Sequence, residues 1–165
     1  MTNRRLDLYA LLILAGVVIF VVLVGASLAR AQGYEGVSVK HAATHVREAR
    51  AALADAQRVQ TATRRYTAAY GATVGRWVWL ADDVGWPPAQ WPTLFFVVDR
   101  ESGGFPGIMN SQGSGAAGLL QEMPDWYNGS RLYYDFPAFN PLNPRLNLYY
   151  GYRGWLVSGW APWSM

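Results

Sequence analysis

Residues 91–104 read WPTLFFVVDRESGG, an apolar run that passes into three charged residues and a serine and ends on a glycine pair. Over so few residues, periodicity alone does not separate a buried strand from a buried helix. Glycine is the usual residue at a helix end, so a helix that stops at Gly103 is the simpler interpretation. Such a helix places Glu101 in its last turn, beneath Phe95 and Val98. A carboxyl group there loses hydration and can keep a proton near neutral pH, as a general acid must.

The stretch that starts at this carboxyl, ESGGFPGIMNSQGSGAAGLLQEMP (101–124), closely resembles the signature of the lytic transglycosylase SLT domain in its phage and actinobacterial forms. That family is related to goose-type lysozyme. Its pattern begins with Glu-Ser and continues through a polar loop into Gly-Ala-x-Gly-Leu-Met-Gln-x-x-Pro. The matching positions here are Glu101, Ser102, Gly115, Ala116, Gly118, Leu119, Leu120, Gln121 and Pro124.

Two later stretches extend the resemblance. NPRLNLYYG (143–151) fits the family's Asn-Pro-x-x-Asn-aliphatic-x-x-Gly, and GWAPW (159–163) is similar to the end of many members. The matches keep their order along residues 91–165. An ordered set of this kind is much more specific than a lone Glu-Ser pair.

The resemblance implies that Glu101 is the catalytic acid and then base, and that further residues contact the substrate. The family places one serine near the substrate's N-acetyl group, and Ser111 and Ser114 are alternatives for it. Tyr149, Tyr150 and Tyr152 are alternatives for an aromatic residue that approaches the acid. The expected substrate-binding residues are Ser102, Ser111, Ser114, Gly118, Gln121, Asn147, Tyr149 and Tyr150.

A mechanism with a single carboxyl is expected. Glycosidases ordinarily pair two carboxylates across the scissile bond. Asp99 lies two residues from Glu101 and points roughly the opposite way on a helix, and Asp125 and Asp135 fall in other segments. The resemblance then implies cleavage between N-acetylmuramic acid and N-acetylglucosamine with help from the substrate's acetamido group. If the sugar's 6-hydroxyl attacks, the enzyme is a lytic transglycosylase; if water attacks, it is a lysozyme (muramidase). The sequence is compatible with both reactions.

The N-terminal part predicts a membrane anchor. Residues 8–29 carry no charge, and at about 1.5 Å per residue they span roughly 33 Å, enough for a bilayer core. Arg4 and Arg5 precede them and should stay cytoplasmic. We expect a single-pass protein of the inner or cell membrane with its C-terminal domain outside the cytoplasm. Ala-Arg-Ala at 29–31 also fits a signal-peptide cleavage site, which would release a secreted or virion-associated protein.

The expected chain is all-α. Residues 1–31 form a cytoplasmic tip and transmembrane anchor (or signal peptide), 32–75 a helical spacer, and 76–165 a small lysozyme-like helical domain. The spacer prediction rests on an Ala-rich stretch, 39–70, without Gly or Pro. Because the last domain is short for the family, an alternative is that the 39–70 segment completes its core.

Composition limits the partners. The chain has no cysteine, and its two histidines, His41 and His45, lack a third ligand, so we expect neither a metal nor another cofactor. A net charge of +3 is too small to indicate nucleic acid. The expected partners are peptidoglycan glycan strands and, through residues 8–29, the membrane; no protein partner is identified.

Two other functions compete with an enzyme. A non-catalytic peptidoglycan-binding module on a stalk would share the cleft without turnover. A membrane-anchored structural or lysis component would use the anchor and the helix, but it leaves the ordered C-terminal match unexplained.

Overall fold

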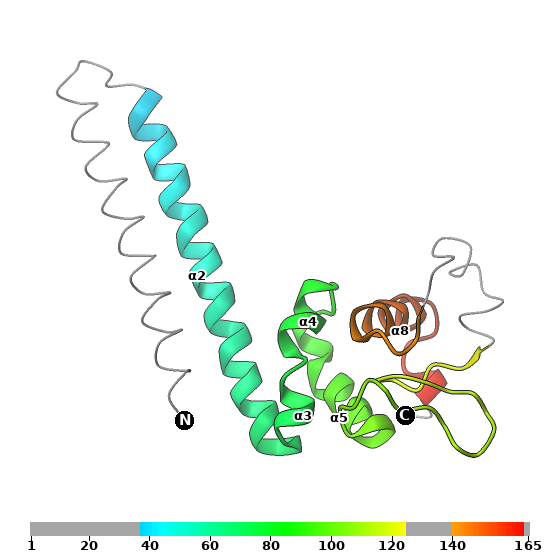
Figure 1. Ribbon diagram of the computed structural model, residues 1–165. Helices are drawn as coiled ribbons and strands as arrows, with labels where there is room; N and C mark the ends of the chain where they lie inside the picture. The colour runs from blue at the N-terminus through cyan, green and yellow to red at the C-terminus, as the bar shows by residue number, and fades with distance from the viewer. Residues whose placement is uncertain (1–36, 125–139, 164–165) are drawn as a thin grey trace. The chain divides into compact units, whose positions relative to one another are not determined.

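The computed structural model describes residues 37–124 and 140–163 (Figure 1). Its elements are α2 (Val37–Tyr70), α3 (Ala72–Gly75), α4 (Val78–Asp83), the 3-10 turn η1 (Pro88–Gln90), α5 (Trp91–Ser102), α8 (Pro144–Ser158) and the 3-10 turn η2 (Ala161–Trp163). Within these residues the regular elements are all helical, and two isolated β-bridges join Ala117 to Met109 and to Glu122. The predicted all-α class is confirmed for this part of the chain.

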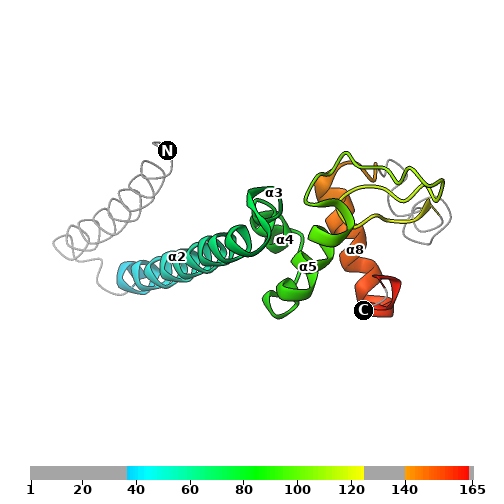
Figure 2. The same ribbon diagram turned by 90° about the horizontal axis from the view of Figure 1, so that it is seen from below.

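The predicted membrane helix, residues 8–29, lies outside the described residues. Between 37 and 124 and between 140 and 163, no helix combines the length and the apolar character needed to cross a bilayer. The longest, α2, is one unbroken helix of 34 residues (Figure 2).

The chain divides into two compact units, Met1–Arg58 and Val59–Met165, and α2 runs across the boundary. Within the second unit the end of α2 packs into the core. Tyr66 is 5 % exposed, and its ring lies 4.6 Å from that of Phe95 between centroids. The last turns of the expected 32–75 spacer therefore belong to the C-terminal domain, as in the alternative stated above.

Helix α5 forms as the sequence predicts. Pro92 stands in its first turn, where a missing N–H costs nothing. Gly103 ends the helix in the left-handed conformation, with φ of 58°, and its N–H donates to the Asp99 carbonyl at 2.9 Å. Glu101 consequently lies in the last turn. One side of the helix is buried in the core through Leu94, Phe95, Val97 and Val98.

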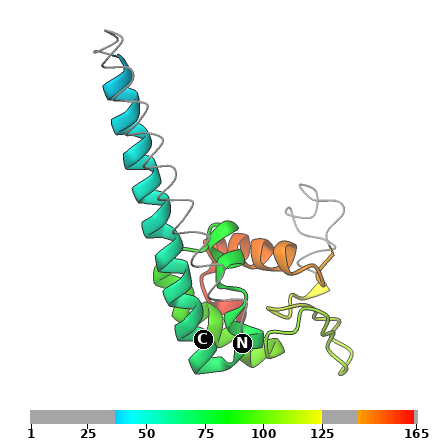
Figure 3. The same ribbon diagram turned by 60° about the vertical axis from the view of Figure 1, so that its left-hand side comes forward.

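Helix α8 begins where its sequence provides a cap. The Asn143 side chain accepts hydrogen bonds from the N–H groups of Arg145 at 3.0 Å and Leu146 at 3.2 Å. Pro144 occupies the first helical turn, where its fixed φ suits the helix. Figures 1 and 3 both show the loop that follows α5 running beneath α8, with η2 nearby.

Buried tryptophans join these helices while keeping their indole N–H groups bonded. Trp86 is 1 % exposed and donates to the Leu148 carbonyl of α8 at 2.8 Å. Trp77 donates to the Gly104 carbonyl just after α5, also at 2.8 Å. Trp77 and Trp86, from the stretch between α3 and α5, thus belong to the core, whereas Trp79 in the same stretch is exposed.

Gly104 should be intolerant of any side chain. Its φ is 79°, and an added Cβ would lie 2.4 Å from the Thr73 carbonyl oxygen. We expect Gly104→Ala to lower the free energy of unfolding by about 2–4 kcal/mol, through backbone strain and overlap with main-chain atoms. Urea denaturation of the full chain in mild detergent measures it. The control is Gly107→Ala, whose Cβ would meet no atom within 4 Å; equal losses in both variants would contradict the prediction.

Candidate active site

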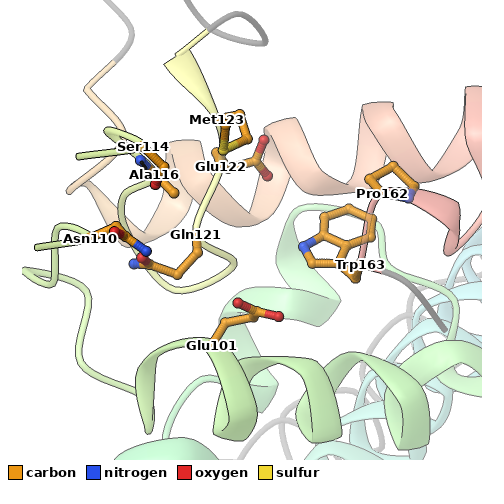
Figure 4. Close-up of a pocket in the computed structure, with 9 residues that line it drawn as sticks. All are labelled: Glu101, Asn110, Ser114, Ala116, Gln121, Glu122, Met123, Pro162 and Trp163. Atoms are coloured by element: carbon orange, nitrogen blue, oxygen red, sulfur yellow. Dashed lines mark hydrogen bonds between the residues drawn. The ribbon is translucent and has the colours of Figure 1, made fainter. Parts of the chain in front are cut away.

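A pocket of about 380 Å³ lies at the end of α5 (Figure 4). Three separate stretches of the chain supply its walls: the last turn of α5, the loop that follows it, and η2. The lining residues are Glu101, Asn110, Ser114, Ala116, Gln121, Glu122, Met123, Pro162 and Trp163. Polar side chains and one large aromatic ring therefore face the same space.

Glu101 enters this pocket as half of an ion pair. Its side chain is 26 % exposed, and Arg100 donates to Oε1 from Nη2 at 2.8 Å and from Nε at 3.2 Å. The same guanidinium donates to the Trp163 carbonyl at 2.6 Å, which links α5 to η2. The predicted loss of hydration at Glu101 is therefore only partial, and one carboxyl oxygen is engaged by Arg100.

Glu122 is the residue that the sequence analysis missed. It is 4 % exposed, and its Oε1 is shielded from solvent without a hydrogen-bond partner among the described residues. A Cβ on Gly151 of α8 would lie 3.0 Å from that oxygen, so the carboxyl packs against a bare stretch of helix backbone. Burial raises the pKa of Glu122 to about 8. Figure 4 shows Glu101 and Glu122 entering the pocket from opposite sides.

The backbone at Gln121 explains why neighbouring residues both line the pocket. Successive side chains of an extended segment point to opposite sides, so an extended Gln121 would have turned Glu122 away. Gln121 instead has φ of 49°, the left-handed region that non-glycine residues seldom adopt. Its Nε2 donates to the carbonyls of Gly118 at 3.0 Å and Ile108 at 3.1 Å, which holds the turn closed.

Two residues predicted to contact substrate instead hold the loop. The buried Ser102 hydroxyl lies 2.9 Å from the Leu119 carbonyl oxygen, within donating distance. Asn147, 0 % exposed, accepts from the Leu120 N–H at 2.9 Å and donates to the Ala117 carbonyl at 3.1 Å. Neither Ser102 nor Asn147 belongs to the pocket lining. Both position the segment that carries Gln121.

The two candidate serines lie in different places, and only one of them lines the pocket. Ser114 lines the pocket, and its Oγ accepts a hydrogen bond from the Ala116 N–H at 3.3 Å. Ser111 is exposed and lies outside the lining. Gly118 is buried with φ of 83°, and a Cβ there would lie 2.1 Å from the Pro141 carbonyl oxygen. Gly118 therefore allows its backbone to approach that of Pro141 closely, and it does not line the pocket.

The candidate tyrosines lie elsewhere. The Tyr149 hydroxyl accepts from Arg153 at 3.0 Å, and its ring lines a second pocket with Asp83, Val84, Arg145 and Leu146. Tyr150 is fully buried, and the Tyr152 ring lies 5.6 Å from that of Trp86. The aromatic residue beside Glu101 is Trp163, whose Nε1 donates to the Leu120 carbonyl at 2.9 Å.

No protein-family model, curated protein or solved structure matches this chain. Among residues 37–124 and 140–163 there is no group of three His, Asp or Glu placed to hold a metal. Asp125 and Asp135, considered above as partners for Glu101, lie outside the described residues. In the described chain the site is defined by two carboxyls in contrasting surroundings.

Glu122 should make stability depend on pH. Its folded pKa of about 8 exceeds the ordinary value of 4.5 expected in the unfolded chain. Its contribution is therefore fully present below pH 4.5, falls as pH rises, and is lost above pH 8, a change of ~5 kcal/mol. We expect Glu122→Gln to remove this slope and Glu101→Gln to retain it. Urea denaturation between pH 4 and 9 measures both; an unchanged slope in Glu122→Gln would contradict the assignment.

Asn147 should be essential to the loop. Asn147→Leu keeps the volume but leaves the Leu120 N–H buried without a partner, and the Ala117 carbonyl keeps only its hydrogen bond from the Glu122 N–H. We therefore expect a loss of about 1–3 kcal/mol in unfolding free energy. The control is Asn140→Leu, an exposed site where the one backbone group bonded to the side chain, the Leu142 N–H, can turn to water. Denaturation curves compare the two variants. A loss of unfolding free energy at Asn147 no greater than that at Asn140 would contradict the role of Asn147 in holding the loop.

Proposed function

We propose that this protein cleaves the β-1,4 glycosidic bond between N-acetylmuramic acid and N-acetylglucosamine in peptidoglycan, with Glu101 as the reacting carboxyl. One observation supports this above all. The pocket contains Glu101, Gln121 and Trp163, which come from the two ends of one stretch, 101–124, and from a second, 159–163, that both resemble the lytic transglycosylase family. Chance local similarities would have no reason to meet in one pocket.

The arrangement suits the chemistry. Both hydrogen bonds from Arg100 go to Oε1 of Glu101, which leaves Oε2 for the ligand. Glu101 would protonate the glycosidic oxygen, and the bond from that oxygen to C1 would break with its electron pair on the leaving sugar. The acetamido oxygen of the substrate would bond to C1. Glu101 would then take a proton from the 6-hydroxyl or from water as that oxygen attacks C1 and the bond from C1 to the acetamido oxygen breaks, with its electron pair returning to the acetamido group.

The rest of the pocket fits a glycan. Asn110, Ser114 and Gln121 offer amide and hydroxyl groups to sugar hydroxyls and amides. Trp163 offers an apolar ring on which a pyranose can pack. The anchor expected at residues 8–29 is consistent with this function, because peptidoglycan lies outside the cytoplasmic membrane. A cleaved signal peptide would deliver the domain to the same compartment.

Glycan binding without cleavage is the second candidate. The observation that favours it is the ion pair between Arg100 and Glu101, which engages one oxygen of the carboxyl within the protein itself. Such a module would retain peptidoglycan without releasing soluble fragments. Sedimentation with sacculi and mass spectrometry of the supernatant separate the two functions.

The role of Glu101 is tested with a neighbouring carboxyl as control. Full-length protein in mild detergent is incubated with purified sacculi, and soluble muropeptides are quantified by mass spectrometry. We expect Glu101→Gln to reduce release by about 100- to 10,000-fold, the usual contribution of general acid–base catalysis. Asp99→Asn, on an exposed side chain of the same helix outside the pocket, should stay within about twofold of the wild type.

The products distinguish the two chemistries. A 1,6-anhydro terminus identifies a transglycosylase and a reducing terminus a muramidase. Equal release by the wild type and Glu101→Gln would exclude the proposed role of Glu101, and no release by the wild type would exclude the enzyme.

A further inference from the structure

The pocket holds two carboxyls whose surroundings differ. Glu101 on α5 is 26 % exposed and bound by Arg100. Glu122, on the opposite wall, is 4 % exposed, and its Oε1 is shielded and unpaired among the described residues (Figure 4). Carboxyls that share a site but differ in burial and in their charged neighbours commonly divide acid and base roles.

Among residues 37–124 and 140–163, the pocket lining brings no cation to Glu122. In the described chain, Glu101 is the other titratable group in the pocket lining, and Arg100 is bonded to Glu101 and to the Trp163 carbonyl. From α8 the adjacent residue is Gly151, which has no side chain. Burial is the cause of the raised pKa of Glu122. Glu122 therefore holds a proton near neutral pH, while Glu101 lies beside Arg100 as its ion-pair partner.

We propose that Glu122 is a second catalytic carboxyl, which gives its proton to the leaving oxygen while Glu101 remains the anion and later acts as the base. The inference rests on the proposed glycosidase function and revises how its proton steps are shared. Glu122, in place of Glu101, donates the proton to the leaving oxygen. Glu101 keeps the second step, in which it accepts the proton of the attacking hydroxyl or water.

The proton balance closes over one cycle. The Glu122 proton moves to the glycosidic oxygen as the bond from that oxygen to C1 breaks, and the electron pair goes to the leaving sugar. The acetamido oxygen bonds to C1, and the Glu101 carboxylate faces the positive charge that develops. As the 6-hydroxyl or water attacks C1, its proton passes to Glu101, and the bond from C1 to the acetamido oxygen breaks with its electron pair returning to the acetamido group. Transfer through solvent from Glu101 to Glu122 restores the starting state.

A packing role would not require a carboxyl here. An apolar side chain could fill the space beside Gly151 without leaving an oxygen buried and unpaired. The left-handed backbone at Gln121 also turns Glu122 toward the pocket at a cost in strain. Both costs are understandable if the carboxyl serves the reaction.

Leaving-group dependence tests the assignment. The substrates are peptidoglycan and an aryl β-glycoside of an N-acetylated glycan whose dinitrophenolate leaves without a proton. We expect Glu122→Gln to lose at least about 100-fold in kcat/KM on peptidoglycan but less than about fivefold on the aryl glycoside. Glu101→Gln should lose activity on both substrates, because its base step remains necessary.

A measurement on the wild type alone does not depend on the folding of any variant. The kcat/KM for peptidoglycan should fall above about pH 8, as Glu122 loses its proton. The kcat/KM for the aryl glycoside should show no such fall. An identical alkaline limb with both substrates would overturn the assignment.

The remaining outcomes separate this inference from the proposed function. Cleavage by wild type with full activity in Glu122→Gln refutes the second carboxyl and keeps the enzyme. Equal losses on both substrates in folded Glu122→Gln indicate a structural role and overturn the inference. Absence of cleavage by the wild type on either substrate refutes both.

Discussion

The site depends on two buried polar side chains that hold segment 117–120. Ser102 reaches it from α5 and Asn147 from α8, and together they bond its carbonyl and N–H groups. Backbone partners pair the N–H groups of Ala117 and Gly118, and the two side chains bond the Leu120 N–H and the Leu119 carbonyl, groups that would otherwise be buried without partners. Because Gln121 and Glu122 follow directly, these hydrogen bonds also fix where both side chains enter the pocket.

The hydrogen bonds from Ser102 and Asn147 bring the backbone at Gly118 close to the backbone at Pro141. Gly118 lies so near the Pro141 carbonyl that no Cβ would fit, and Gln121 takes a left-handed conformation to continue the chain. Strain at a non-glycine residue persists only where the surroundings over-determine it. Here the hydrogen bonds from Ser102 and Asn147 hold the backbone in this conformation. The resulting turn directs the side chains of Gln121 and Glu122 into one cavity.

The sequence was informative where local chemistry decides. The glycine pair predicted the end of α5, and hence Glu101 in its last turn. The domain boundary was not predictable in the same way, because α2 continues unbroken through Arg58 into Val59. Helical propensity does not change where a helix enters a core; Tyr66 becomes buried only through its contact with Phe95. That contact is long-range, and no local pattern encodes it.

The same distinction applies to the site. Residue types alone could not tell that Ser102 and Asn147 bond backbone groups 17 and 27 residues away, so both looked like substrate contacts. Glu122 was not singled out, because its burial depends on packing against Gly151 of α8, a contact that the residue order does not show. The property sought at Glu101, a carboxyl stripped of water, is instead strongest at Glu122. A general acid needs that environment and a base needs the opposite one, so a pocket that holds both is better equipped for the two proton transfers than one carboxyl that must change roles.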